Sequence, residues 1–258
     1  MNMTGNTILI TGGGSGIGRA LAEAFHARGN RVVIAGRRQS VLDEVTAWHP
    51  GMRSALLDIS DAGSMGTFAA QLTAEVPELN VVIHNAGIMQ NETLPSGDLG
   101  VAEATIATNL LGPIRLTAAL LPHLLTRPQA TIMTVSSGLA FVPLALTPTY
   151  GASKAAIHSY TQALRYQLKD TAVQVTELIP PYVQTGLQGE WQANDPSAMP
   201  LADFIGETLR LLEASPDAAE ITVERVKALR FAEAGGAGAY NAFFTRMNDA
   251  VSAARAHG

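Results

Sequence analysis

Short apolar segments alternate with longer amphipathic ones along most of this chain. The short segments carry Val, Ile and Leu at successive positions, which is typical of strands in a parallel sheet with both faces covered. They predict strands at Thr7–Thr11, Arg31–Ala35, Arg53–Leu57, Leu79–His84, Ala130–Ser136 and Val173–Ile179. The amphipathic segments predict helices at Ile17–Arg28, Gln39–Trp48, Ser64–Ala74, Ala102–Leu125 and Ser153–Asp170. This alternation predicts βαβ units, and therefore an α/β fold with a doubly wound parallel sheet and helices on both faces.

The alternation runs on without an internal repeat or a low-complexity linker, so we expect a single domain over residues 1–258. It is interrupted at Gly186–Ala202, where Gly, Asn, Pro and Ser predict an irregular loop before a helix at Leu201–Glu213. Long loops in compact domains are often functional, so residues 186–213 are the expected substrate loop; an inert surface excursion is the alternative. A last strand is expected at Glu220–Val223 and a C-terminal helix at Ala239–Ala254.

Composition narrows the class of protein. Of 258 residues, 47% are hydrophobic and 15% are charged, which excludes disorder and provides for a large core. The absence of cysteine excludes disulfides, thiolate nucleophiles and iron–sulfur ligation. The histidines show no paired ligand spacing, so we expect no metal. The net charge of −5 argues against a nucleic-acid partner.

The chain also lacks the expected marks of a membrane or exported protein. No apolar stretch approaches the ~18 residues of a membrane helix, because the apolar run at Leu116–Leu125 is broken by Pro122 and His123. The strand predicted from Thr7 follows no basic leader segment. We therefore expect a cytoplasmic protein that does not associate with membranes.

A glycine-rich turn joins the first predicted strand to the first predicted helix. Residues Thr11–Gly18 read Thr-Gly-Gly-Gly-Ser-Gly-Ile-Gly. Glycines permit positive φ and let the backbone approach a pyrophosphate, which then rests on the helix N-terminus. The spacing Gly12-x-x-x-Gly16-x-Gly18 differs from the ordinary G-x-G-x-x-G, and a merely flexible turn is the alternative. Its place between strand and helix favours a dinucleotide site in a Rossmann-like sheet.

The end of the second predicted strand indicates which dinucleotide is bound. An acidic residue in this place accepts hydrogen bonds from the adenosine ribose of NAD, but here the strand ends at Gly36. Arg37 and Arg38 follow at once. A guanidinium binds phosphate through charge-assisted and often bidentate hydrogen bonds, so this pattern predicts NADP(H) in preference to NAD(H). Solvated loop arginines are the alternative.

Three further motifs follow later predicted strands. Asn85–Gly87 ends the fourth strand, Ser137 ends the fifth, and Tyr150 and Lys154 lie at the start of the next helix. Residues four apart share one face of a helix, one turn from each other. Ligands of open α/β sheets bind beyond the carboxyl ends of the strands, where all of these residues fall.

On these residues the sequence resembles the single-domain form of the short-chain dehydrogenase/reductase family. The matching positions are Thr11–Gly18, Asp58, Asn85–Gly87, Asn109, Ser137, Tyr150, Lys154 and Thr185. The segments Ser136–Phe141, Pro180–Pro181 and Glu220–Arg225 further resemble the DltE-like branch. The resemblance implies hydride transfer between a nicotinamide cofactor and a carbonyl or alcohol. We accordingly expect an NADPH-dependent carbonyl reductase or alcohol dehydrogenase.

The expected chemistry needs a proton donor for the alkoxide that forms. An isolated tyrosine has a pKa near ~10, too high for efficient exchange at neutral pH. A lysine ammonium ~5 Å away would contribute about 3 kcal/mol, or roughly two pKa units toward phenolate. Tyr150 is therefore the expected acid/base, with Lys154 lowering its pKa and Ser137 donating to the carbonyl oxygen.

The family resemblance implies further roles. Lys154 would also hold the nicotinamide ribose, Asn109 would anchor a water in a proton relay, and Thr185 would meet the carboxamide. Asp58 would contact adenine, with a helix cap as the alternative role, and a helix kink is the alternative for Asn109. The full expected cofactor set is Gly12, Ser15, Gly16, Ile17, Gly18, Arg37, Arg38, Asp58, Asn85, Ala86, Gly87, Tyr150, Lys154, Pro180, Val183 and Thr185. His84 replaces a family Asn, and we expect it to be packed and hydrogen-bonded.

The expected substrate pocket is apolar. The segment between Ser137 and Tyr150 has no charged residue, and the loop after Thr185 has three acids and no Lys or Arg. Anionic substrates are ordinarily met by cations, so we expect an uncharged ketone, aldehyde or secondary alcohol. A role of part of this surface in the core or in an interface is the alternative. The expected pocket residues are Gly138, Leu139, Leu144, Tyr182, Leu187 and Trp191.

Two other functions remain open at this stage. A non-catalytic NADP(H)-binding sensor could use the same fold, and so could a 3-oxoacyl thioester reductase. The helices predicted at Ala102–Leu125 and Ser153–Asp170 carry more apolar residues than one buried stripe requires. Together with the resemblance, this predicts a homodimer or homotetramer.

Overall fold

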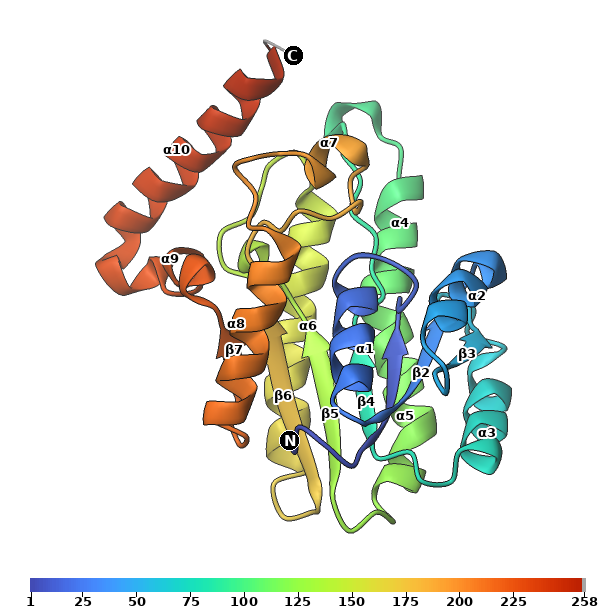
Figure 1. Ribbon diagram of the computed structural model, residues 1–258. Helices are drawn as coiled ribbons and strands as arrows, with labels where there is room; N and C mark the ends of the chain where they lie inside the picture. The colour runs from blue at the N-terminus through green and yellow to red at the C-terminus, as the bar shows by residue number, and fades with distance from the viewer. Residues whose placement is uncertain (257–258) are drawn as a thin grey trace.

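The computed structural model describes residues 1–256, with side chains through residue 253, and contains one parallel sheet (Figure 1). The strand order is β3-β2-β1-β4-β5-β6-β7. The strands are β1 (Thr7–Thr11), β2 (Arg31–Gly36), β3 (Arg53–Leu56), β4 (Val81–His84), β5 (Ala130–Val135), β6 (Val173–Ile179) and β7 (Glu220–Thr222). The order reverses between β1 and β4, which creates a crevice at the carboxyl ends of these strands. The predicted doubly wound sheet is confirmed.

Helices cover both faces of the sheet. They are α1 (Gly16–Ala27), α2 (Gln39–Trp48), α3 (Met65–Glu75), α4 (Gly100–Ile106), α5 (Gly112–Leu124), α6 (Pro148–Gln167), α7 (Glu190–Ala193), α8 (Leu201–Ala214), α9 (Lys227–Arg230) and α10 (Gly236–Ala256). Most predicted boundaries fall within two residues of these. The largest difference is at α6, which begins at Pro148 and not at Ser153 because a proline favours the first helical turn.

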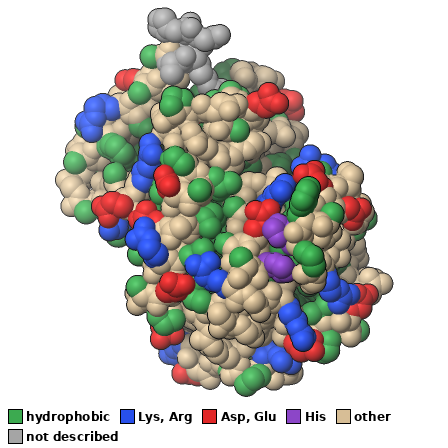
Figure 2. All heavy atoms as spheres, in the orientation of Figure 1, with side chains coloured by type: hydrophobic (Ala, Val, Ile, Leu, Met, Phe, Trp, Pro, Cys, Tyr) green, Lys and Arg blue, Asp and Glu red, His purple; other side chains and the backbone are tan. Residues whose placement is uncertain are grey.

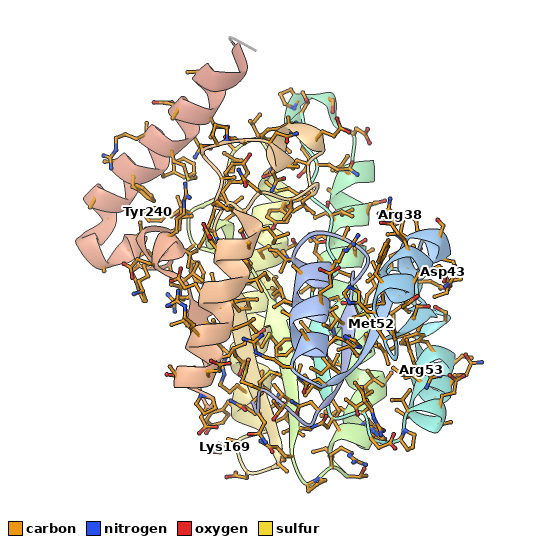
Figure 3. All side chains as sticks on the ribbon, viewed as in Figure 1. Arg38, Asp43, Met52, Arg53, Lys169 and Tyr240 are labelled. Carbon is orange, nitrogen blue, oxygen red and sulfur yellow. The ribbon has the colours of Figure 1, made fainter. Side chains whose placement is uncertain are left out.

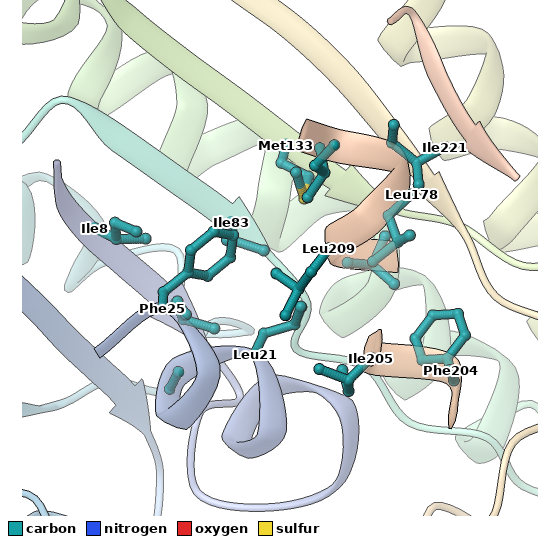
Figure 4. Packing of buried hydrophobic residues seen from close by; sticks show 14 of the residues in the cluster. Ile8, Leu21, Phe25, Ile83, Met133, Leu178, Phe204, Ile205, Leu209 and Ile221 are labelled. Carbon is teal, nitrogen blue, oxygen red and sulfur yellow. The ribbon is translucent and has the colours of Figure 1, made fainter. Parts of the chain in front are cut away.

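Two apolar layers hold the helices to the sheet. On one face, α1, α2 and α8 bury their side chains against the central strands, and Phe25 and Phe204 are fully buried there. Figure 4 shows this packing for Ile8, Leu21, Phe25, Ile83, Met133, Leu178, Phe204, Ile205, Leu209 and Ile221. On the other face, α3, α5 and α6 pack around Leu116 and Leu120. Each large side chain buried in this way contributes roughly 1.5–3 kcal/mol, so the sheet is a rigid base for the residues at its edge.

One long helical segment corrects an expectation about membranes. The segment Gly100–Leu124 is long and apolar enough to cross a membrane by length and composition, although no stretch of that length was expected. It continues through Pro122 and includes a π-helical turn at Ala107–Leu111 between α4 and α5. Core helices of soluble proteins pass the same test. Here Leu116, Leu120 and Leu124 lie fully buried against the sheet.

The segment after β6 is more ordered than the predicted irregular loop. It contains the short helix α7 and a parallel bridge between Val183 and Met199. The Gln192 side chain is buried and donates to the Val183 carbonyl at 2.9 Å and to Thr185 Oγ1 at 3.2 Å. Glycine, proline and asparagine predicted the loop correctly. The burial of Gln192, which orders it, produces no periodic pattern in the sequence and could not be predicted.

The C-terminal helix α10 extends beyond the carboxyl ends of the strands (Figure 1). It rests on the segment that follows Ser137. Tyr240, labelled in Figure 3, donates to the Phe141 carbonyl at 3.2 Å, and Asn248 accepts from the Ala145 N–H at 2.6 Å. On the face drawn in Figure 2, acidic and basic side chains are interspersed over the surface.

Candidate active site

The glycine turn after β1 is packed too closely for side chains. A Cβ on Gly18 would lie 2.3 Å from Asn85 Nδ2 and 2.4 Å from the Gly12 carbonyl oxygen. A Cβ on Gly12, whose φ is +68°, would lie 2.9 Å from Ala86 Cα. The turn is therefore held as a bare backbone cradle at the N-terminus of α1, which is the arrangement that a pyrophosphate requires.

Asn85 fixes this cradle to the end of β4. Its Nδ2 donates to the Thr11 carbonyl at 3.1 Å and to the Gly12 carbonyl at 3.4 Å. Thr11 Oγ1 in turn accepts from the Asn85 and Ala86 N–H groups, both at 3.1 Å. The side chain of Asn85 thus positions the turn, and Ala86 and Gly87 present their backbone to the groove beside it.

A cavity of about 420 Å³ extends from the glycine turn over the end of β2. Gly36, Arg37 and Arg38 line it, as the expected adenosine site requires. Leu57 and Ile59 also line it, whereas the Asp58 side chain between them is not among its lining residues in the part of the chain that the structure describes.

Asp58 has local partners at the end of β3. Its carboxylate accepts from the Ser60 N–H at 2.9 Å and from the Ser60 hydroxyl at 2.6 Å. These bonds, with a smaller contribution from the Arg37 charge, lower the pKa of Asp58. These bonds form a local turn six residues before Ser64, the N-cap of α3, so they are not the helix cap that was the alternative role for this residue. A contact between Asp58 and adenine remains a prediction.

A second cavity of about 840 Å³ continues from the first. Both cavities are lined by Gly12, Ser15, Arg38, Ala86, Gly87 and Ile88, so they form two ends of one groove. Ser137, Tyr150 and Lys154 all line the second end. Every predicted pocket residue also lines it, namely Gly138, Leu139, Leu144, Tyr182, Leu187 and Trp191. The expected cofactor residues Gly16, Ile17, Pro180, Val183 and Thr185 lie there as well.

Tyr150 and Ser137 face each other across this cavity. Ser137 lies two residues after the end of β5, and its Oγ accepts from the Leu139 N–H at 3.1 Å. Burial raises the pKa of Tyr150 to about 12, while a hydrogen bond with Ser137 lowers it in part. The expectation that Lys154 would bring this pKa below its ordinary value was wrong in direction, because spacing alone does not reveal desolvation. At this pKa Tyr150 is protonated at neutral pH and is a weaker acid than a free tyrosine, so proton transfer from it needs a nearby charge that stabilises the phenolate.

Lys154 lies one turn below Tyr150 on α6. Its ammonium lies 5.6 Å from the centroid of the Tyr150 ring and donates to the Val135 carbonyl at 2.8 Å. Burial lowers the pKa of Lys154 to about 8, and the charge of Glu177 partly opposes this shift. The Lys154 ammonium thus lines the groove, and its pKa depends on the charged groups around it.

Asn109 lies in the π-helical turn between α4 and α5. Its Oδ1 accepts from the Ile88 N–H at 2.8 Å, and its Nδ2 donates to the Ile88 carbonyl at 2.9 Å. Nδ2 also donates to Ser153 Oγ at 3.2 Å, and that hydroxyl donates to the Tyr150 carbonyl at 2.7 Å. Asn109 therefore ties the backbone after β4 to the helix that carries the tyrosine. The water-anchoring role that the resemblance implies remains a prediction.

His84 is a packed residue, as expected. It is 3% exposed, and its Nε2 lies 2.9 Å from Thr117 Oγ1. Burial lowers the pKa of His84 to about 4, so the ring is neutral at neutral pH. His84 therefore packs the end of β4, and we assign it no role in the reaction.

Several residues of the second cavity were not predicted. Leu229 comes from α9, and Met247, Ala250 and Val251 come from α10. Gly138 explains how α9 reaches the site, because a Cβ there would lie 2.6 Å from Leu229 Cδ1. An amphipathic C-terminal helix gives no sequence signal of the surface on which it docks.

One group of side chains beside the site has the composition of a metal site. Ligand atoms of His158, Glu177 and Glu220 lie within 4.8 Å of one another. Arg230 already pairs with both oxygens of Glu220, at 2.7 and 2.9 Å, and His158 Nδ1 lies 2.7 Å from Glu177 Oε2. These pairings favour an ion-pair network, and the expected lack of a metal remains a prediction.

Comparisons with known proteins identify relatives. The family model "short chain dehydrogenase" matches residues 6–196. The chain is 38% identical over 253 residues to the uncharacterized oxidoreductase DltE of Bacillus subtilis, covering 96% of this chain and 98% of that protein. It is 30% identical over 188 residues to mouse dehydrogenase/reductase SDR family member 7B, covering 70% of this chain but only 58% of that protein.

Solved structures share the fold. A short-chain dehydrogenase from Burkholderia cenocepacia in complex with NADP superposes with a TM-score of 0.81 at 24% identity, covering 95% of this chain and 99% of that chain. The closed form of a serine dehydrogenase complexed with NADP+ superposes with a TM-score of 0.73 at 27% identity, covering 80% and 88%. A Burkholderia phymatum relative in complex with NAD has a TM-score of 0.78 at 20% identity, covering 91% and 95%.

Proposed function

Since the chain belongs to the short-chain dehydrogenase/reductase family, we propose that it is an NADPH-dependent carbonyl reductase and alcohol dehydrogenase. Its substrate class is an uncharged, fairly apolar ketone, aldehyde or secondary alcohol. The observation that carries the proposal is the convergence of Ser137, Tyr150 and Lys154 in one cavity that opens onto the glycine turn. Three groups of this kind beside a dinucleotide cradle suit hydride transfer to a carbonyl.

In the proposed reaction the bound cofactor supplies a hydride to the carbonyl carbon. Ser137 donates a hydrogen bond to the carbonyl oxygen and fixes its position. Tyr150, which is protonated at neutral pH, gives its hydroxyl proton to the carbonyl oxygen. The Lys154 ammonium stabilises the phenolate that is left behind. Alcohol oxidation runs through the same groups in reverse.

The preference for NADP(H) over NAD(H) rests on the adenosine end of the groove. Arg37 and Arg38 line it, and Gly36 takes the place where a carboxylate would bind the ribose hydroxyls of NAD. A carboxylate there would repel a 2′-phosphate, whereas an arginine binds it. Arg38, labelled in Figure 3, lies at the start of α2.

The substrate class rests on the lining of the reacting end. Apolar side chains come from the loop and from both C-terminal helices, among them Leu139, Leu187, Leu229 and Met247. The acid of this lining, Asp195, accepts from the Tyr182 hydroxyl at 3.0 Å and from the Ser197 N–H at 2.8 Å. A neutral substrate leaves these bonds intact and needs no counter-ion.

The test is NADPH oxidation against a panel of neutral cyclic and aryl ketones, carboxylate-bearing ketones and a 3-oxoacyl thioester, each repeated with NADH. We expect turnover of neutral ketones with NADPH and its loss in Tyr150→Phe, which still binds NADPH. Preference for the carboxylates overturns the substrate class, and preference for the thioester identifies a thioester reductase. NADPH binding without turnover of any compound identifies a sensor.

We also propose a cytoplasmic homodimer or homotetramer. Leu111 and Leu125 flank α5 and are 36% and 46% exposed, and Tyr166 on α6 is 70% exposed. Apolar side chains on two neighbouring helices suit pairing about a two-fold axis. Light scattering coupled to size-exclusion chromatography measures the assembly, and a monomer overturns this assignment.

A further inference from the structure

Glu177 is a buried carboxylate in the middle of β6. It is 0% exposed, and its Oε2 lies 2.7 Å from His158 Nδ1. Its other oxygen, Oε1, is buried and has no hydrogen-bond partner among the described residues. Burial of an ionised carboxylate costs free energy unless charges nearby compensate it. The charged groups around Glu177 therefore determine its role.

The nearest element is α6, which carries the catalytic lysine. Lys154 and His158 are one turn apart and share one face of this helix. The Lys154 ammonium bonds to the Val135 carbonyl at 2.8 Å, and Val135 is paired with Leu178 across the β5–β6 ladder. Glu177 is on the adjacent rung, paired with Thr134. Lys154 and Glu177 therefore lie beneath the same stretch of α6, where their hydrogen-bond partners are the Val135 carbonyl and His158, respectively.

We propose that Glu177 is a positioning residue whose fixed negative charge keeps the Lys154 ammonium charged at neutral pH. The catalytic consequence rests on the proposed function, since Lys154 serves the proton transfer there. The electrostatic link itself belongs to the fold and can be measured without turnover.

Desolvation makes such a counter-charge necessary. Burial lowers the pKa of Lys154 to about 8, and the charge of Glu177 opposes this shift. Loss of the carboxylate would move the pKa of Lys154 toward or below neutrality, because an unpaired buried ammonium prefers to lose its proton. Lys154 would then be uncharged at the pH at which it must stabilise the phenolate.

The other charged groups nearby do not replace Glu177. They are Tyr150, His158 and Arg165 on α6, Glu220 on β7, Arg230 on α9, and Glu233 just after it. Arg165 donates to the Val175 and Ala219 carbonyls, and Arg230 forms a bidentate pair with Glu220. Glu220 is thus paired with Arg230, whose charge also acts on Glu177, and Oε1 of Glu177 has no hydrogen-bond partner among the described residues.

The chain permits a direct test because it has three lysines, Lys154, Lys169 and Lys227. In protein labelled with 13C at lysine Cε, each lysine gives one NMR signal whose shift reports its titration, and Lys154→Arg assigns the signal of interest. In Glu177→Gln we expect the Lys154 titration to fall by about one pH unit or more. The matched control Glu220→Gln, the same change at the neighbouring carboxylate, should leave it in place.

Two further variants guard against a misfolded mutant. Glu177→Leu removes the charge and fills the space with an apolar side chain, and it should lower the Lys154 titration as Glu177→Gln does. Glu177→Asp keeps the charge and should titrate near the wild type. A Lys154 titration in the folded Gln and Leu variants that coincides with the wild type overturns the proposal.

The pH profile then connects the charge to turnover. With an active ketone, the high-pH limb of kcat/KM should move to lower pH in Glu177→Gln by as much as the NMR titration moves. A high-pH limb that stays in place while the titration moves overturns the catalytic role of the counter-charge. A wild type that turns over no carbonyl refutes the proposed function, and the titration still decides the electrostatic link.

Discussion

The substitution Gly18→Ala tests whether the glycine turn is a cofactor cradle. The new Cβ would lie 2.3 Å from Asn85 Nδ2 and 2.4 Å from the Gly12 carbonyl, against ordinary contacts of 3.4–4 Å. The turn or the asparagine must therefore move by roughly 1 Å, and overpacking of this kind costs about 1–3 kcal/mol. If the backbone yields, the cradle opens. At 1.4 kcal/mol per factor of ten, NADPH binding should weaken by about 10–100-fold.

The assay is titration of NADPH fluorescence together with thermal unfolding. Gly206→Ala is the matched control, because a Cβ on Gly206 in α8 would meet nothing within 4 Å. There the alanine should stabilise the helix by about 0.5–1 kcal/mol and leave NADPH binding unchanged. If Gly18→Ala binds NADPH as tightly as the wild type, the close approach of the backbone is not what binds the cofactor, and the reasoning fails.

Three further predictions concern the cofactor end, the π-helical turn and the buried histidine. Arg37→Ala should weaken NADPH binding by about 10–100-fold and leave NADH binding unchanged, as measured by fluorescence titration; equal losses for both cofactors would contradict the 2′-phosphate contact. Asn109→Ala leaves both backbone groups of Ile88 without their partner and should lower the free energy of unfolding by about 2 kcal/mol or more in a urea titration. Burial lowers the pKa of His84 from 6.5 in the unfolded chain to about 4 in the folded protein. Between these pH values the unfolded chain binds the extra proton, so the free energy of unfolding falls as the pH falls from 6.5 to about 4. The full loss is about 3 kcal/mol. His84→Asn should flatten this acid limb in thermal unfolding measured from pH 7 to pH 4, and an unchanged limb would show that another group causes it.

Much of the fold could be predicted because apolar periodicity reports burial directly. The strand predicted at Thr7–Thr11 and the helix predicted at Gln39–Trp48 have the observed bounds. The convergence of Ser137, Tyr150 and Lys154 on one cavity could also be predicted, since each one follows a strand or begins a helix at a fixed spacing. Topology then brings them to one edge of the sheet without further information.

Other features depend on packing that spacing does not record. Burial reverses the expected direction of the Tyr150 pKa, and a pattern of residue types does not say how dry a site is. Glu177 lies in a correctly predicted strand, yet only its contact with His158 shows that its side chain faces α6. The docking of α10 is likewise fixed by single contacts, such as that between Tyr240 and Phe141.

The helices α9 and α10, which follow the last strand, contribute to the cavity separately from the rest of the chain. The segment that matches the family model, residues 6–196, holds the glycine turn, the serine, the tyrosine and the lysine. Leu229, Met247 and Val251, which close the reacting end of the groove, all come after it. Substitutions there can reshape the cavity while the sheet and the hydride-transfer groups stay as they are. The residues of α9 and α10 that line the cavity are therefore positions at which its shape can be changed without altering the segment that matches the family model.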